Sequence, residues 1–178
     1  MMHDEQTSNK LIVLFVLDRL SMPIQEDNLI GMCCYDRDTS WIPSTIFAKQ
    51  AIFDLAQSGF VSRTPSASGG VMLSLTSDGA LCLSHFFKDI PKSLRDEITE
   101  YVSQNRIAYK KKQEFSCDYY RNNDNTYTVV LQIFEITKPV MELKLNVPSR
   151  QAAKDLYESW KEKAVDTYKA IYDLLLND

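Results

Sequence analysis

The stretch Phe53–Ser84 reads FDLAQSGFVSRTPSASGGVMLSLTSDGALCLS, and it decides the fold of the first half of the chain. Gly59 stands where a helix ends on a left-handed residue. Val61–Arg63 and Val71–Leu75 have the composition of strands, and the small, turn-forming residues between them indicate a loop. Thr76 then suits the N-cap of a new helix. The stretch therefore predicts a helix, a hairpin and a second helix in succession.

Helical periodicity precedes and follows this hairpin. Helices are predicted over Asn9–Leu20, about Gln25–Tyr35, about Thr45–Ser58 and Ser77–Phe87, and the connection after the second helix has room for a short strand about Ser40–Ile42. Three helices, a two-stranded hairpin and a further helix are the order of a winged helix-turn-helix. In that fold Thr45–Ser58 is the recognition helix and Arg63–Gly70 is the wing.

A second pattern begins after Asp89-Ile90-Pro91, where we place the domain boundary. The segments that follow are predicted to be a helix about Lys92–Lys112, strands Glu114–Arg121, Thr126–Ile136 and Val140–Val147, and a helix from Ser149 onward. The connections between the strands are short, so they should form an antiparallel meander. The predicted fold class is α+β, with a winged helix-turn-helix over residues 1–90 and a helix–three-stranded sheet–helix domain over residues 91–178.

Composition narrows the class of protein. The chain has 178 residues, of which 44% are hydrophobic, as expected for a chain that buries a core. Its longest apolar run, Leu11–Leu17, is far shorter than the roughly 20 residues of a membrane-spanning helix. The first ten residues are polar, without the basic-then-apolar order of a secretory signal. We therefore expect a cytoplasmic protein without a membrane partner.

Residues for metal, cofactor or nucleophile chemistry are few. The four cysteines, Cys33, Cys34, Cys82 and Cys117, lack the spacing of a zinc site and are expected to be buried free thiols. The histidines are His3 and His85 alone, and Gly69-Gly70 lacks the lysine and helix of a phosphate-binding loop. We expect no catalytic residues, no metal and no cofactor, and the chain is not predicted to be an enzyme.

Taken together, the chain resembles the bacterial domain of unknown function 4364 family, whose N-terminal half is similar to winged-helix transcription factors. The resemblance covers nearly the whole length and rests on the order and spacing of short motifs. They include Asn9-Lys10-Leu11-Ile12, Leu17-Asp18-Arg19, Met22-Pro23, Ala51-Ile52, Leu55, Ser58-Gly59-Phe60, Leu75-Thr76 with Gly79, Ile90-Pro91, Leu143-Lys144-Leu145-Asn146-Val147-Pro148 and Trp160-Lys161. The resemblance implies a winged-helix fold and a regulatory role, and the family lends no established activity.

The leading function is a DNA-binding transcriptional regulator. Candidate DNA-contacting residues are Ser44, Thr45, Lys49, Gln50 and Arg63. Residues 1–90 carry a net charge of −4 and residues 91–178 carry zero, which argues against tight non-specific DNA binding. Lys49 and Arg63 are therefore either DNA contacts or ordinary surface residues. The alternative function is a winged-helix protein–protein interaction module that does not bind DNA.

The terminal helix suggests a homodimer through the C-terminal domain. Ser149–Leu176 would span about 40 Å, longer than a three-stranded sheet of this size can cover. Trp160 and Ile171 lie on its apolar stripe, and the other explanation is that the helix simply overhangs its own sheet. Trp41 could anchor a partner or lie under the recognition helix. The sequence leaves any small-molecule effector unidentified.

Overall fold

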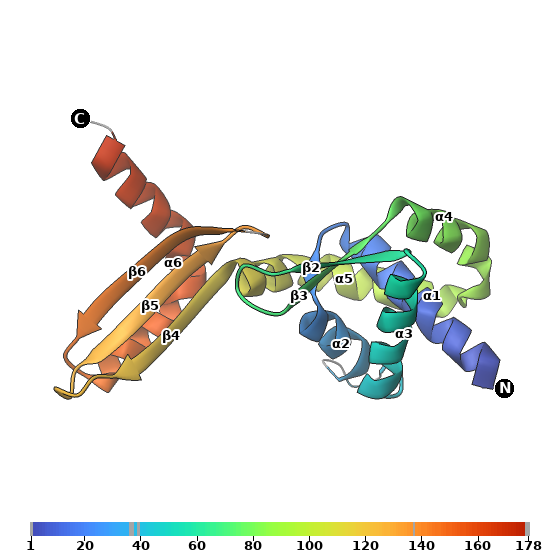
Figure 1. The fold of residues 1–178 in the computed structure, drawn as a ribbon, viewed down its shortest axis with the longest axis horizontal. Helices are drawn as coiled ribbons and strands as arrows, with labels where there is room; N and C mark the ends of the chain where they lie inside the picture. The colour runs from blue at the N-terminus through green and yellow to red at the C-terminus, as the bar shows by residue number, and fades with distance from the viewer. Residues whose placement is uncertain (1, 36–37, 39, 137, 177–178) are drawn as a thin grey trace. The chain divides into compact units, whose positions relative to one another are not determined.

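The computed structural model describes residues 2–35, 38, 40–136 and 138–176. Over these residues the chain is a mixed α+β protein with six α-helices and two three-stranded antiparallel sheets (Figure 1). The elements are α1 (Met2–Leu20), β1 (Ile24–Gln25), α2 (Glu26–Cys34), α3 (Thr45–Gln57), β2 (Val61–Pro65), β3 (Val71–Leu75), α4 (Ser77–Phe86), the 3₁₀ turn η1 (Phe87–Asp89), α5 (Lys92–Glu114), β4 (Phe115–Arg121), β5 (Tyr127–Phe134), β6 (Pro139–Val147) and α6 (Arg150–Leu176).

The chain divides into two compact units, Met1–Tyr109 and Lys110–Asp178. The division lies inside α5, whereas the sequence placed it between residues 90 and 91. Ile98, Val102 and Tyr109 account for the difference, because these three residues of α5 are buried in the core of the first unit. The helix that looked like the start of the second domain therefore completes the first.

The first unit packs four helices and most of α5 around a small sheet of order β1-β3-β2. β1 pairs with β3 through Ile24 and Leu73, both fully buried. The short strand expected about Ser40–Ile42 is not formed. The backbone N–H groups of Trp41 and Ile42 instead donate to the carbonyl of Cys33, at 2.9 and 3.1 Å, and close the C-terminal end of α2.

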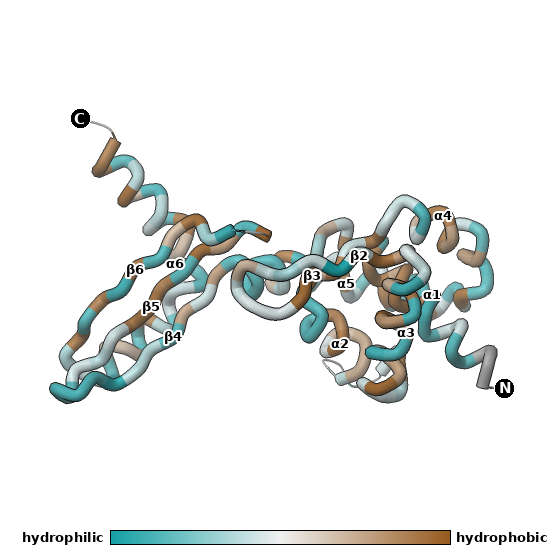
Figure 2. Tube along the Cα trace, viewed as in Figure 1, coloured by the Kyte–Doolittle hydropathy of each residue, from teal (hydrophilic) through white to brown (hydrophobic). Residues whose placement is uncertain are grey.

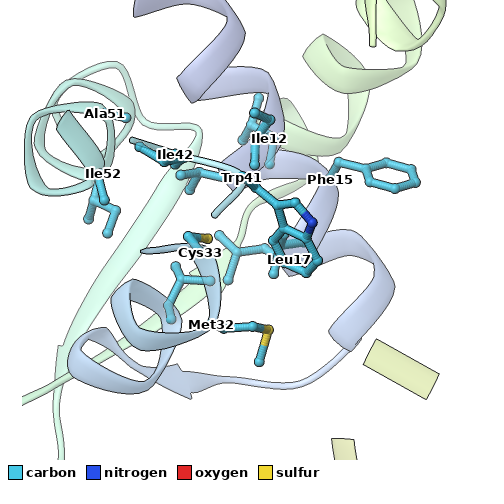
Figure 3. Close-up of a cluster of buried hydrophobic side chains, with 14 of the residues drawn as sticks. Ile12, Phe15, Leu17, Met32, Cys33, Trp41, Ile42, Ala51 and Ile52 are labelled. Carbon is cyan, nitrogen blue, oxygen red and sulfur yellow. The ribbon is translucent and has the colours of Figure 1, made fainter. Parts of the chain in front are cut away.

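Trp41 belongs to this core. Figure 3 shows it among labelled side chains of α1, α2 and α3. Its indole N–H donates to Glu97 Oε1 at 3.0 Å, and its ring lies edge-on to Tyr101 of α5, with centroids 5.5 Å apart. Only 8% of its surface is exposed, so Trp41 packs against α5 rather than offering an anchor to a partner.

The hairpin forms where the sequence indicated it. β2 and β3 pair antiparallel from Val61–Leu75 to Pro65–Val71, so β2 runs two residues beyond its predicted end. Thr76 joins the hairpin to α4, because its hydroxyl accepts from the N–H of Gly79 at 3.0 Å and donates to the carbonyl of Gly59 at 2.7 Å. The Thr76 side chain thus caps α4 and also binds Gly59, just after the end of α3. These two hydrogen bonds connect α3, the hairpin and α4.

The second unit is the sheet β4-β5-β6 with α6 on one face. Ala153, Trp160 and Ala164 of α6 are buried, and the indole N–H of Trp160 donates to the carbonyl of Gln132 at 3.2 Å. Trp160 is therefore a core residue of its own unit and not an exposed interface residue. Beyond it, α6 projects past the sheet (Figure 1) and ends in apolar residues (Figure 2). Tyr172, Leu174 and Leu175 are each more than half exposed there.

None of the described helices combines the length and the apolar character that crossing a membrane requires.

Candidate functional site

Helix α3 has one buried and one exposed face. Ala48, Ala51, Ile52 and Leu55 are buried, and they follow the three- and four-residue spacing of an amphipathic helix. The helix begins after Ser44, whose hydroxyl accepts from the N–H of Phe47 at 3.4 Å. Burial of one face fixes which side chains the helix presents outward.

The exposed face of α3 mixes polar and apolar residues. Lys49 and Gln50, two of the candidate DNA contacts proposed from the sequence, are exposed there. They lie between two large apolar side chains, Ile46 with 74% of its surface exposed and Phe53 with 50%. An exposed pair of this size on one helix face is typical of a contact surface rather than of a solvated helix.

Gln50 is held by a neighbour on its own helix. Its amide donates to Asp54 Oδ1 at 2.7 Å, and Lys10 of α1 forms an ion pair with Asp54 Oδ2 at 2.8 Å. The hydrogen bond from Lys10, and then that from Gln50, lower the pKa of the Asp54 carboxyl. The carboxylate thus ties α3 to α1, and Gln50 must exchange this bond to contact a base.

Arg63 of β2 is paired as well. Its guanidinium lies 2.8 Å from Oε2 of Glu26, the first residue of α2. Glu26 and Asp27 lie in the first turn of α2, where the helix dipole favours negative charge. Gln25, just before them, donates to the hydroxyl of Ser68 in the hairpin loop at 2.8 Å. These contacts hold the hairpin against the start of α2.

An open depression joins α3, the start of α2 and the hairpin. The described residues that line it are Glu26, Asp27, Ile46, Lys49, Gln50, Phe53 and Arg63. Two cations and two carboxylates leave it with no net formal charge. The site can therefore offer hydrogen-bond donors and apolar contacts, together with few unneutralised positive charges.

Three of the five residues proposed from sequence meet in this depression, namely Lys49, Gln50 and Arg63. Ser44 uses its hydroxyl as the N-cap of α3, and Thr45 is exposed in the first turn beside it. Both lie at the N-terminal end of the helix, where backbone N–H groups are free to meet an anion.

Sequence reasoning missed the apolar and acidic parts of this face. Ile46 and Phe53 fall at the same helical spacing as the buried stripe but on the opposite side, and that offset was available from the sequence. Glu26 gave no such signal, because its partner Arg63 is 37 residues away and is brought near only by the fold.

The remaining residues that could bind a metal or react as nucleophiles do not form a site in the described part of the chain. Within the described part of the chain, no three His, Cys, Asp or Glu side chains come together to hold a metal ion. The four cysteines are free; Cys33 is buried and the other three are half-buried. Burial, and then the charge of Asp118, raise the pKa of Cys117 to about 11, which keeps it a neutral thiol.

Comparison with known proteins identifies the family. The family described as Domain of unknown function (DUF4364) matches residues 9–175, and the chain therefore belongs to it. Neither a curated protein nor a solved structure matches the chain.

Proposed function

We propose that this member of the DUF4364 family is a DNA-binding transcriptional regulator of the winged-helix type. In this proposal α3 is the recognition helix and the β2–β3 hairpin is the wing. The observation that carries it is the placement of Lys49 and Gln50 of α3 beside Arg63 of the hairpin, around one open depression. A helix and an adjacent hairpin presented on one face suit entry of the helix into a major groove with the hairpin against the backbone.

The chemistry of each residue suits a particular contact. Lys49 can bind a phosphate or the acceptors of a guanine, and Gln50 can pair with an adenine once it leaves Asp54. Ile46 can pack on a thymine methyl group. Thr45, together with the first backbone N–H groups of α3 that Ser44 does not cap, can bind a phosphate. These contacts would position the helix and read a small number of bases.

The charges of the face set the expected strength of binding. No ion pair joins Lys49 to another described residue, while Arg63 shares its charge with Glu26. Few phosphates would be neutralised, so we expect weak binding by one copy and a small dependence on salt. A homodimer through the C-terminal unit would raise the affinity by engaging two half-sites at once. The exposed apolar end of α6 supports such a contact.

Fluorescence anisotropy with random and promoter duplexes at low salt tests the proposal. We expect Lys49→Ala to weaken binding and to reduce the salt slope by about one unit. Arg63→Ala should reduce the slope by less, because Glu26 already offsets part of that charge. Lys92→Ala, which removes an exposed lysine at the start of α5, is the matched control and should bind as the wild type does. Equal affinity of the Lys49→Ala variant and the wild type would contradict the proposal.

A second candidate function has its own observation. Ile46 and Phe53 expose a large apolar area beside the carboxylates of Glu26 and Asp27, and such a face suits a protein partner better than a phosphate backbone. The alternative is thus a winged-helix protein–protein interaction module. A folded wild-type chain that binds neither duplex at low salt would favour this alternative over DNA binding.

We further propose that the protein is cytoplasmic and is not an enzyme. We also propose that it needs no metal or organic cofactor. Elemental analysis and absorbance of protein purified without a metal-binding tag test the last point. Stoichiometric zinc or a bound chromophore would contradict it.

A further inference from the structure

Strand β6 is an outer strand of the second sheet. The order β4-β5-β6 pairs β6 with β5 on one side, and no described strand pairs with its other side. An outer strand leaves a row of backbone N–H and C=O groups that can pair with another chain. Proteins that stay monomeric commonly protect such an edge with charge, proline or a covering element.

The apolar face of β6 is also poorly covered. Met141, Leu143 and Val147 pack against the core that α6 covers, and Leu145 alternates with them on the same side of the sheet. α6 lies mainly against β4 and β5. As a result Leu145 keeps 41% of its surface exposed although it points to the helix-covered face. Both the edge and part of its apolar face are therefore open.

We propose that β6 pairs antiparallel with β6 of a second copy of this chain, centred on Leu143, so that two three-stranded sheets join into one of six strands. A two-fold axis through such a pair makes the strand its own partner. We assign the partner strand to a second copy of this chain because the sequence of β6 is complementary to itself in this register.

The complementarity follows from the residues on each side of Leu143. Glu142 falls opposite the partner's Lys144, and Lys144 falls opposite the partner's Glu142. Met141 falls opposite the partner's Leu145 on the apolar face. Opposite charges and apolar pairs across neighbouring strands both stabilise a sheet. Glu142 and Lys144 already lie 3.2 Å apart within one strand, so pairing would build an alternating cluster of four charges.

The other outer strand shows the opposite pattern. β4 runs from Phe115 to Arg121, so the same symmetric pairing would be centred on Asp118. Two copies of Asp118 would then face each other, and like charges directly opposite destabilise a sheet. The charge pattern thus disfavours self-pairing at β4 and favours it at β6.

Charge reversal at β6 tests the inference in the full-length chain without DNA, so its outcome is independent of the DNA-binding proposal. Sedimentation equilibrium should show a wild-type dimer at micromolar concentration. Lys144→Glu alone and Glu142→Lys alone each place like charges opposite one another twice, and each should raise the dissociation constant at least about tenfold. The double variant, with both residues exchanged, should restore the dimer.

Mixing the two single variants gives the decisive result. A chain with Lys at 142 and 144 is complementary to a chain with Glu at both positions, so the mixture should form a heterodimer although each variant alone dissociates. Asp118→Lys on β4 is the control and should leave the dimer intact. Circular dichroism and tryptophan fluorescence should show that all variants fold. A monomeric wild type, single variants that remain dimeric, or a mixture that stays monomeric would overturn the inference.

Discussion

Glu26→Gln is expected to increase DNA affinity, because Glu26 neutralises one of the few cations of the proposed binding face. Its carboxylate lies 2.8 Å from the guanidinium of Arg63, and the two side chains are 20% and 38% exposed. The substitution keeps the size of the side chain and removes its charge. Arg63 is then free to bind a phosphate, and a carboxylate that repels phosphates is removed from the depression.

The magnitude follows from counterion release. One additional phosphate contact steepens the salt dependence of log K by about 0.9, which amounts to roughly fifteenfold in affinity between 1 M and 50 mM salt. Since Arg63 must reorient to use the contact, we expect a gain of about three- to tenfold at 50 mM salt. The cost to folding should be small, because a partly exposed ion pair contributes about 0.2–1 kcal/mol.

Anisotropy titrations across a salt series measure both quantities. Asp78→Asn is the matched control, because Asp78 is also an acidic residue in the first turn of a helix but lies outside the depression. In an Arg63→Ala background the gain from Glu26→Gln should shrink. A Glu26→Gln protein that is folded and binds DNA no better than the wild type would refute the reasoning.

Three further expectations concern stability and reactivity. Gly79→Ala should lower the free energy of unfolding by about 1–3 kcal/mol in chemical denaturation, because a Cβ there would collide with the carbonyl oxygen of Phe60; an unchanged midpoint would contradict this. The hydrogen bond from Lys10 lowers the pKa of Asp54, so ionised Asp54 should stabilise the fold above about pH 4, and this stabilisation should be lost as the pH falls through the lowered pKa. Asp54→Asn should flatten that acid limb in thermal melts. Burial and Asp118 raise the pKa of Cys117 to about 11, so at pH 8 it should react with Ellman's reagent much more slowly in the native state than in urea; equal rates would contradict its burial.

The sequence predicted well those helices, strands and turns that are determined by neighbouring residues. Gly59, the small-residue loop and the capping residue Thr76 fixed the order of helix, hairpin and helix, since each acts on its immediate neighbours. The alternation in Val140–Val147 likewise predicted β6. The α+β class followed from these features, and the family was predicted from a resemblance carried by motifs along nearly the whole chain.

Features that depend on distant partners were predicted poorly. β1 is two residues long and exists because Ile24 pairs with Leu73, a contact that no local pattern contains. The predicted first helix began at Asn9, whereas α1 begins at Met2, because exposed polar residues such as Gln6, Thr7 and Ser8 extend the helix beyond its buried part. The domain boundary lies inside α5 for a related reason, since Ile98, Val102 and Tyr109 are buried in the core of the first unit.

The sequence predicted where the candidate site lies, but it did not predict the contacts that its side chains make. The positions of Lys49 and Gln50 on an exposed helix face follow from the buried stripe of α3. The pairing of Arg63 with Glu26 and of Gln50 with Asp54 depends on side-chain contacts that composition does not reveal. Both pairings lower the expected strength of DNA binding, because Arg63 and Gln50 must exchange these contacts to bind DNA.

Hydrogen exchange of the full chain with and without a duplex at low salt tests the central claim most directly. Binding through α3 and the hairpin predicts slower amide exchange in the first turns of Thr45–Gln57 and along Val61–Leu75. The exchange rates of the amides in α4 should not change. Slower exchange confined to other segments, while the duplex is bound, would contradict the account.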